Sequence, residues 1–303
     1  MKGNKKHATV LLTETVGGLS LAPGNTAVDA TVGTGGHAKE IAERIGAKGT
    51  LLCIDADEKS IARSKERLKD SEAKLIFVQG NFRNLKTIAH EAGIDSAEGI
   101  LFDLGWHTEQ LTAGKGFSFK SNDPLLMTLS ERTQTLTAKD IIADWDEDEI
   151  AKIIREYGEE RFSGRIARAI VETRKEKEID TADFLAEIIA GAVPGFYRRS
   201  RLHPATRTFQ ALRIAVNDEL NALTEALGDA LDLLSPGGRL AVISFHSLED
   251  RIVKRVFRAA EDSGRGKRIT KKPIVPSQEE RSANPRARSA KLRIFNKRTN
   301  EKT

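Results

Sequence analysis

The sequence has a single cysteine among 303 residues. No disulfide can form within one chain, so a reducing, cytoplasmic location is expected. Cys53 stands in the apolar run 51–54, which predicts a buried core thiol rather than a nucleophile. The sequence contains no run of about 18 apolar residues, so no membrane span is expected. The basic N-terminus is not followed by the apolar segment that a secretion signal requires.

Recognisable metal-ligand spacing is also missing. The six histidines and the acidic residues form no compact pattern such as His-Glu-x-x-His. We therefore expect no metal ion in the site. Hydrophobic residues make up 39% and charged residues 31% of the chain, which is typical of a globular protein and excludes a largely disordered one.

Charge is distributed unevenly along the chain. The net charge is +5, but residues 251–303 hold 17 Lys and Arg against five Asp and Glu, so the preceding residues are acidic in sum. A basic tail on an acidic body indicates a polyanionic partner such as a nucleic acid. The alternative is a solvated tail that contacts nothing.

Residues 26–105 alternate short apolar runs with helix-like segments. Strands are predicted at 26–30, 50–55, 75–78 and 99–103, with helices at 37–45 and 60–69 between them. This order predicts βαβ units, and the continuous apolar character of the strands predicts a sheet buried on both faces. The expected fold class is α/β, with a Rossmann-like and mostly parallel sheet.

An all-helical segment then interrupts the pattern. Thr137 followed by Asp140 resembles a capping box, and apolar residues at helical spacing follow it. We expect a Rossmann-like domain at 1–110 and 205–303, with a helical insert at 111–204 that recognises the substrate.

The α/β pattern returns in the last third of the chain. One long helix is predicted over 209–234, a strand over 239–245 and a helix over 250–260. Residues 268–275 and 291–296 are predicted as an antiparallel pair, so the last strand of the sheet should run antiparallel.

A glycine-rich loop, residues 29–37, follows the first predicted strand. Glycine lets the backbone turn tightly and approach a ligand closely. Asp55 ends the second strand 22 residues after Gly33, where a carboxylate can accept hydrogen bonds from ribose hydroxyls. The pattern indicates a nucleoside-containing cofactor. A dinucleotide stays open, because Gly33, Gly35 and Ala38 also satisfy the dinucleotide fingerprint, and so does an α/β domain that binds nothing.

Three features favour S-adenosylmethionine over a dinucleotide. Asp29 precedes the loop, where a carboxylate would repel a pyrophosphate and attract a sulfonium or ammonium group. The third strand is followed by Asn81 and Phe82, an amide and an aromatic ring suited to flank an adenine. The fourth strand ends in Asp103, at the sheet edge where α/β proteins bind their ligands.

Longer motifs extend along nearly the whole chain. They are the segments His7–Leu12, Thr31–His37, Asp103–Gly105, Gly116–Phe119, Tyr157–Phe162, His203–Gln210, Ser244–Arg251 and Asn284–Ser289. Through them the chain resembles the ribosomal RNA small-subunit methyltransferase H family, from about His7 to Arg298. The resemblance implies a class I methyltransferase fold interrupted by a helical domain. It also implies that S-adenosylmethionine donates a methyl group to the N4 amine of a cytidine in the decoding region of small-subunit ribosomal RNA.

The resemblance also implies which residues contact the cofactor. By position they are Gly35, Gly36, His37, Asp55, Phe82, Asp103 and Gln110. The chain departs from the family where two serines usually follow Asp-Leu-Gly-x, because His107 and Thr108 stand there. Thr108 keeps a hydroxyl, whereas His107 is bulkier and can titrate, which leaves base binding at this loop open.

The residue types favour transfer to nitrogen. Methylation at cytosine C5 needs a cysteine nucleophile, and Cys53 is not placed for that role. The cytosine amine is a poor nucleophile because its lone pair is delocalised into the ring. Asp103 is the candidate acceptor for a hydrogen bond from this amine, with orientation of the cofactor as the alternative role. Alignment of the reactants can supply much of the rate.

Two groups of residues are candidates for contact with RNA. Trp106 is expected to stack on the unstacked target base or to be a core aromatic. His107 is a candidate for RNA contact in the loop beside the reaction centre, and His203 and His246 either shape the base pocket or are structural. Phosphate contacts are expected from Arg198, Arg199, Arg201 and Arg207, and from the tail residues Arg265, Lys267, Arg268, Lys271, Lys272, Arg286 and Arg288. The expected partner is small-subunit ribosomal RNA in the assembled or late-assembling subunit.

Two other functions stay open at this point. A nicotinamide-dependent oxidoreductase would use the glycine loop but gives the basic tail no role. A non-catalytic RNA-binding or assembly factor that kept the fold gains some weight from His107 and Thr108. Cofactor binding separates the first alternative from a methyltransferase, and turnover separates the second.

Overall fold

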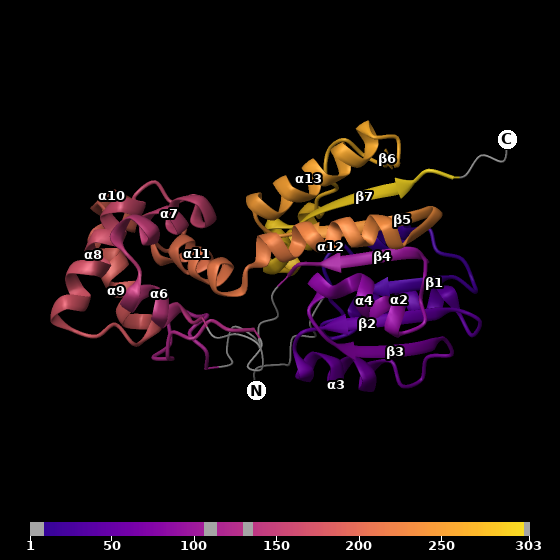
Figure 1. Ribbon diagram of the computed structural model, residues 1–303, viewed down its shortest axis with the longest axis horizontal. Coiled ribbons are helices and arrows are strands. Elements are labelled where there is room, and N and C mark those ends of the chain that lie inside the picture. Colours follow the sequence, from indigo (N-terminus) through magenta and orange to yellow (C-terminus); the bar gives the residue numbers. More distant parts are fainter. Residues whose placement is uncertain (1–8, 106–113, 130–135, 300–303) are drawn as a thin grey trace. The chain divides into compact units, whose positions relative to one another are not determined.

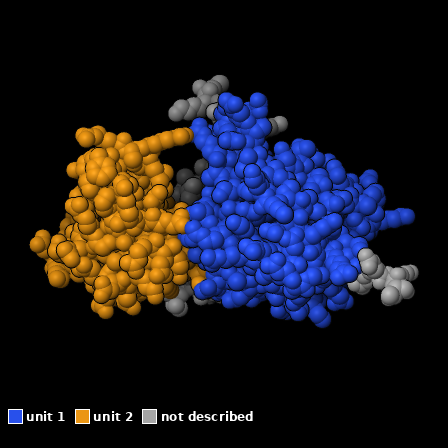
Figure 2. Space-filling model, turned by 90° about the horizontal axis from the view of Figure 1, so that it is seen from above, with its two compact units in different colours: residues 1–105, 220–303 blue, residues 106–219 orange. Residues whose placement is uncertain are grey.

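The computed structural model describes residues 9–105, 114–129 and 136–299 (Figure 1). The chain divides into two compact units, residues 1–105 with 220–303 and residues 106–219 (Figure 2). The second unit extends beyond the predicted boundary at residue 204, because helix α11 (Ala205–Asn217) packs against α7 (Glu147–Gly158) within it. Among the described residues, no helix is both long and apolar enough to span a membrane.

The first unit is built on a seven-stranded sheet of order β3-β2-β1-β4-β5-β7-β6. The strands are β1 (Thr26–Asp29), β2 (Thr50–Asp55), β3 (Lys74–Gln79), β4 (Ala97–Asp103), β5 (Leu234–Ser244), β6 (Gly266–Arg268) and β7 (Lys291–Lys297). Pairs from β3 to β5 are parallel, and β7 runs antiparallel to both β5 and β6. The predicted α/β class with a mostly parallel sheet is confirmed.

Helices cover both faces of this sheet (Figure 1). One face packs on α4 (Leu85–Glu91), α12 (Glu219–Leu233) and α13 (Ser247–Asp262). The other packs on α1 (Leu12–Leu19), α2 (Gly36–Ile45) and α3 (Glu58–Arg67). Successive residues of a strand point to opposite faces, so Val28 enters one core and Ala27 the other. This explains the continuous apolar runs of the central strands.

The second unit is helical around one apolar core. Besides α7 and α11 it contains α6 (Ala138–Asp144), α8 (Ser163–Glu176), α9 (Ala182–Ala192) and the short α10 (Gly195–Arg198). Thr137 begins α6 with the predicted capping box, in which its hydroxyl accepts from the Asp140 N–H at 3.1 Å and Asp140 accepts from the Thr137 N–H at 2.7 Å.

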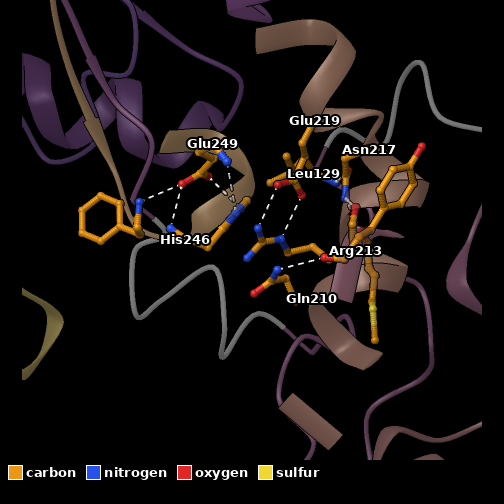
Figure 3. Close-up of polar contacts among 10 residues, drawn as sticks. Leu129, Gln210, Arg213, Asn217, Glu219, His246 and Glu249 are labelled. Atoms are coloured by element: carbon orange, nitrogen blue, oxygen red, sulfur yellow. Dashed lines mark hydrogen bonds and ion pairs between the residues drawn. The ribbon is translucent and has the colours of Figure 1, made fainter. Parts of the chain in front are cut away.

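The single helix predicted over 209–234 is wrong, because the chain breaks it at Asp218. This residue has a left-handed φ of 48° and ends α11 before α12 begins. The buried Asn217 accepts a hydrogen bond from the Leu129 N–H at 2.9 Å and donates to the Met127 carbonyl at 2.8 Å (Figure 3). Arg213 donates two 2.9 Å hydrogen bonds to Glu219 across the break. These contacts with distant segments stabilise a turn that helical periodicity does not reveal.

The antiparallel pair at the C-terminus is present, but the range predicted for its first strand, 268–275, is wrong. Strand β6 is Gly266–Arg268 and shares only Arg268 with that range, and the rest of it contributes an isolated bridge between Ile274 and Leu292. The short helices α14 (Gln278–Ala283) and η2 (Pro285–Ser289) then lead into β7.

Candidate active site

Three aspartates end adjacent parallel strands of the sheet: Asp55 on β2, Asp29 on β1 and Asp103 on β4. Parallel strands direct their carboxyl ends to the same edge, and the ligand sites of α/β proteins lie there. Asp29 is 1% exposed and Asp55 9% exposed, whereas the Asp103 side chain is 20% exposed. The edge therefore gathers three carboxyl groups with little access to water.

The glycine loop after β1 is held against one of these acids. The Gly33 N–H donates to Asp55 Oδ2 at 2.8 Å, and the Asp57 N–H donates to Asp55 Oδ1 at 2.9 Å. Gly33 and Gly35 have φ values of 53° and 76°, which favour glycine, and Gly35 is the N-cap of α2. A carboxylate offers about four acceptor positions, so Asp55 retains capacity for the hydroxyl groups of a ligand.

Burial raises the pKa values of all three acids. The pKa of Asp29 rises to about 8, because burial and the neighbouring charges of Asp103 and Asp55 outweigh a hydrogen bond from the Thr31 N–H. Burial raises the pKa of Asp55 to about 6 and also raises that of Asp103. A cation placed here would favour the ionised acids, so the edge is suited to a positively charged ligand.

His37 and Asp103 face each other at this edge. His37 Nε2 lies 3.1 Å from the Val10 carbonyl oxygen, and Nδ1 lies 3.5 Å from Asp103 Oδ2. A carbonyl only accepts hydrogen bonds, so Nε2 carries a hydrogen. His37 is buried, which lowers its pKa and favours the neutral ring. Nδ1 of that ring presents a lone pair to Asp103, and a proton placed between the two groups has an acceptor on either side.

Phe82 and Asn81 follow β3, at the same edge of the sheet. The half-buried Phe82 ring meets Phe102 edge to face, with centroids 5.8 Å apart. Asn81 Oδ1 accepts from the Arg83 N–H at 2.9 Å and caps the 3-10 helix η1 (Phe82–Asn84). Phe82 is therefore available as one wall of a nucleoside site, while the Asn81 carbonyl is already used.

Arg286 brings a positive charge to the same edge from the far end of the chain. It lies on η2, and its guanidinium group acts to lower the pKa of Asp103 against the effect of burial. From the sequence, Arg286 was predicted only to contact phosphate as one of the tail residues. No local signal links residues 183 positions apart, so its proximity to Asp103 had to come from the fold.

His246 caps a helix. Its Nδ1 accepts from the Glu249 N–H at 3.4 Å, and Glu249 Oε2 accepts from the N–H groups of Phe245 and His246 at 2.7 and 3.2 Å (Figure 3). This reciprocal pattern is a capping box at the start of α13. It supports the structural alternative for His246. Glu249 was not predicted, although an acid three residues after the cap is the usual signature of this motif.

The candidates in the helical unit fall into two classes. Arg198, Arg199 and Arg201 are exposed, whereas Arg207 donates to the Glu159 carbonyl at 2.8 Å. The His203 ring stacks on Phe119 with centroids 4.4 Å apart, and its Nδ1 accepts from the Ala205 N–H at 3.2 Å. Burial, followed by the charge of Lys120, lowers the pKa of His203. Trp106, His107, Thr108 and Gln110 lie outside the described residues.

Part of the basic tail is engaged within the first unit. Arg265 pairs with Asp232, and Arg268 pairs with Glu261. The side chains of Lys267, Lys271, Lys272 and Arg288 are exposed. Fewer positive charges of the tail are therefore available to a polyanion than the sequence indicates. Two of them are neutralised by acids of α12 and α13.

Comparisons with known proteins give one consistent result. The family model described as the MraW methylase family matches residues 4–298. Proteins named ribosomal RNA small subunit methyltransferase H are similar over nearly their whole length. The one from Brevibacillus brevis is 46% identical, covering 96% of this chain and 98% of that protein, and the one from Clostridium botulinum is 45% identical, covering 96% and 99%. A solved S-adenosylmethionine-dependent O-methyltransferase from Thermotoga maritima is 9% identical with a TM-score of 0.44, covering 99% and 71%, which is too distant to carry a functional comparison.

Proposed function

The chain belongs to the MraW methylase family, and from this premise we propose that it methylates the N4 amine of a cytidine in the decoding region of small-subunit ribosomal RNA. S-adenosylmethionine is the methyl donor of this family of enzymes. The names of the similar proteins support ribosomal RNA as the substrate. The proposed partner is the assembled or late-assembling small subunit, in the cytoplasm.

The observation that carries the proposal is the set of three acids at one sheet edge, two buried and one partly buried. Their chemistry fits S-adenosylmethionine, which bears a sulfonium and an ammonium group. Asp55 would accept hydrogen bonds from the ribose hydroxyls, and Asp29 would offset positive charge. Gly35, Gly36 and His37 would line the same site with Phe82 and Gln110. When bound, S-adenosylmethionine supplies a methyl group on a positively charged sulfur.

Asp103 is the proposed acceptor for the amine. Methylation of N4 releases one of its two protons, so a group beside the amine must accept a hydrogen bond and then that proton. The raised pKa of Asp103 makes it a stronger base than an ordinary aspartate. The Nδ1 lone pair of His37 lies 3.5 Å from Asp103 Oδ2, where it can accept a hydrogen bond from the acid once the proton has arrived. A hydrogen bond from N4 would also localise the amine lone pair for attack.

The helical unit is proposed to recognise the RNA. Its exposed Arg198, Arg199 and Arg201 suit phosphate contacts, which position the RNA without reading its sequence. Trp106, His107 and His203 are proposed to contact the target base, and His246 to shape its surroundings from the start of α13.

The test is methyl transfer to small ribosomal subunits that lack cytidine N4-methylation. The purified protein is incubated with them and radiolabelled S-adenosylmethionine, the RNA is digested, and the labelled nucleoside is identified. We expect label in N4-methylcytidine. Asp103→Asn should lower the rate by about a hundredfold or more. Asp95→Asn is the matched control, because Asp95 is exposed beyond the amino end of β4.

Three results would contradict the proposal or a part of it. Label in a different nucleoside would refute the N4 target. No label, with S-adenosylmethionine still bound, would favour a non-catalytic RNA-binding factor. An Asp103→Asn variant that binds the cofactor and transfers methyl groups at the original rate would remove Asp103 from the chemistry.

A further inference from the structure

A pocket of about 270 Å³ lies in the first unit, where the turn between β5 and α13 meets the segment before β7. Its lining includes Phe245 and Ser247 from the first of these segments, Arg281, Arg288 and Ser289 from the second, and Lys291 from the start of β7. The motifs Ser244–Arg251 and Asn284–Ser289 thus form two of its walls. The methyl-transfer chemistry proposed for Asp103 leaves most of both motifs without a role.

The lining of this pocket is cationic. Its lining residues include one lysine, two arginines, His246 and two serines, and no carboxylate is among them. Lys291 pairs with Asp250 at 3.2 Å, and the Arg281 Nε–H donates to the Pro276 carbonyl at 2.8 Å. Arg288 is exposed, and its side chain makes no ion pair or hydrogen bond within the described part of the chain. Its guanidinium group is therefore free to bind an anion.

Two features connect the pocket to Asp103. Phe245 lines the pocket, and its ring lies close to Gly105. A Cβ atom added to Gly105 would be 2.8 Å from the nearest carbon of that ring. Gly105 in turn donates its N–H to Asp103 Oδ1 at 3.4 Å. On the other side, Arg286 acts on Asp103 from η2, the same short helix that carries Arg288. The pocket therefore adjoins the proposed reaction centre within one unit.

We propose that this pocket, the Arg288 pocket, binds a backbone phosphate of the RNA beside the target cytidine. The proposal rests on the proposed function for its substrate. Arginine forms paired hydrogen bonds with two phosphate oxygens, and the Ser289 hydroxyl can donate to another. Phe245 and the 49%-exposed Val275 give an apolar surface for the attached sugar. The bound phosphate fixes the nucleotide so that its base reaches Asp103.

The test compares two small ligands that differ only in phosphate. Cytidine 3′,5′-bisphosphate and cytidine are titrated separately into the protein saturated with S-adenosylhomocysteine, and both affinities are measured by NMR. The unmodified protein should bind the bisphosphate about tenfold more tightly or better, the effect of one charge-assisted pair. Arg288→Ala should abolish this preference, and Arg288→Lys should keep part of it because it keeps the charge.

Arg44→Ala is the matched control. Arg44 is also exposed, but it lies in the last turn of α2, toward the opposite edge of the sheet, and its replacement should leave the preference intact. Thermal unfolding of each variant checks that the fold is kept. Equal affinity of the unmodified protein for both ligands would overturn the proposal, and so would an Arg288→Ala variant that keeps the preference. The ligand titrations do not require methyl transfer. Failure of the proposed function would therefore appear separately, in the labelling assay.

Discussion

Asp29 is a fully buried acid whose pKa of about 8 leaves it largely protonated at neutral pH. Burial is the main cause, and the charges of Asp103 and Asp55 add to it. A bound cation would reverse this balance, because it favours the ionised carboxyl group. With S-adenosylmethionine bound at this edge as proposed, Asp29 would couple cofactor binding to the release of a proton.

This coupling predicts that the affinity for S-adenosylmethionine rises with pH. Between about pH 6 and 8, binding must remove the Asp29 proton, so the affinity should increase by up to about tenfold per pH unit. Isothermal titration at pH 6, 7 and 8 in buffers of different ionisation enthalpy measures both the affinity and the proton release. Asp29→Asn should flatten the pH dependence, whereas Asp95→Asn should preserve it. An unmodified protein with constant affinity over this range would refute the coupling.

The same residue predicts how the stability of the cofactor-free protein depends on pH. The folded protein holds the Asp29 proton more tightly than the unfolded chain, where the pKa is near 3.8. Its contribution to stability is complete below about pH 4 and is lost as the pH rises toward about 8. Denaturant unfolding at several pH values should show a decline for the unmodified protein that is shallower in Asp29→Asn. A decline of equal slope in both proteins would assign the effect to other groups.

At the scale of elements, the break between α11 and α12 depends on Asn217 rather than on helix propensity. Asn217→Ala would remove the hydrogen bonds that Asn217 makes with the Leu129 N–H and the Met127 carbonyl. Buried groups left unsatisfied cost about 1–3 kcal/mol, so the unfolding free energy should fall by about 2 kcal/mol. The exposed Asn122 gives the matched control, Asn122→Ala. Equal stabilities of the two variants in denaturant titration would contradict this role.

The sequence predicted elements whose signal is local. The strands predicted at 26–30, 50–55 and 99–103 are mostly apolar runs. β1 and β2 lie within the first two ranges, and β4 begins two residues before the third and ends with it. Because parallel strands end at one edge, Asp29, Asp55 and Asp103 could also be expected together. The turn at Asp218 and the approach of Arg286 to Asp103 were not predictable, because each depends on contacts between segments far apart in the sequence. Helix α1 was missed because it is one short segment of eight residues.

At the scale of the whole molecule, charge should control the encounter with RNA. The exposed Arg198, Arg199 and Arg201 and the Arg288 pocket offer about four phosphate contacts. With four contacts, the affinity of a protein for single-stranded RNA falls by roughly 50-fold when the salt concentration rises from 50 to 200 mM. Binding of unmethylated small subunits, measured by filter retention across this range, checks the slope. Arg288→Ala should reduce the slope of log K against log salt by about 0.7. A slope near zero would refute phosphate-driven binding.

The connection between β4 and β5 has a consequence for synthesis. β4 ends at Asp103 and its parallel neighbour β5 begins at Leu234, so the whole helical unit is translated between them. At about 5–20 residues per second, the roughly 130 intervening residues take about 6 to 26 s. During that time β4 has β1 on one side and an open hydrogen-bonding edge on the other. Such edges pair readily with other chains, so the nascent protein passes through an interval of seconds in which misassembly competes with folding.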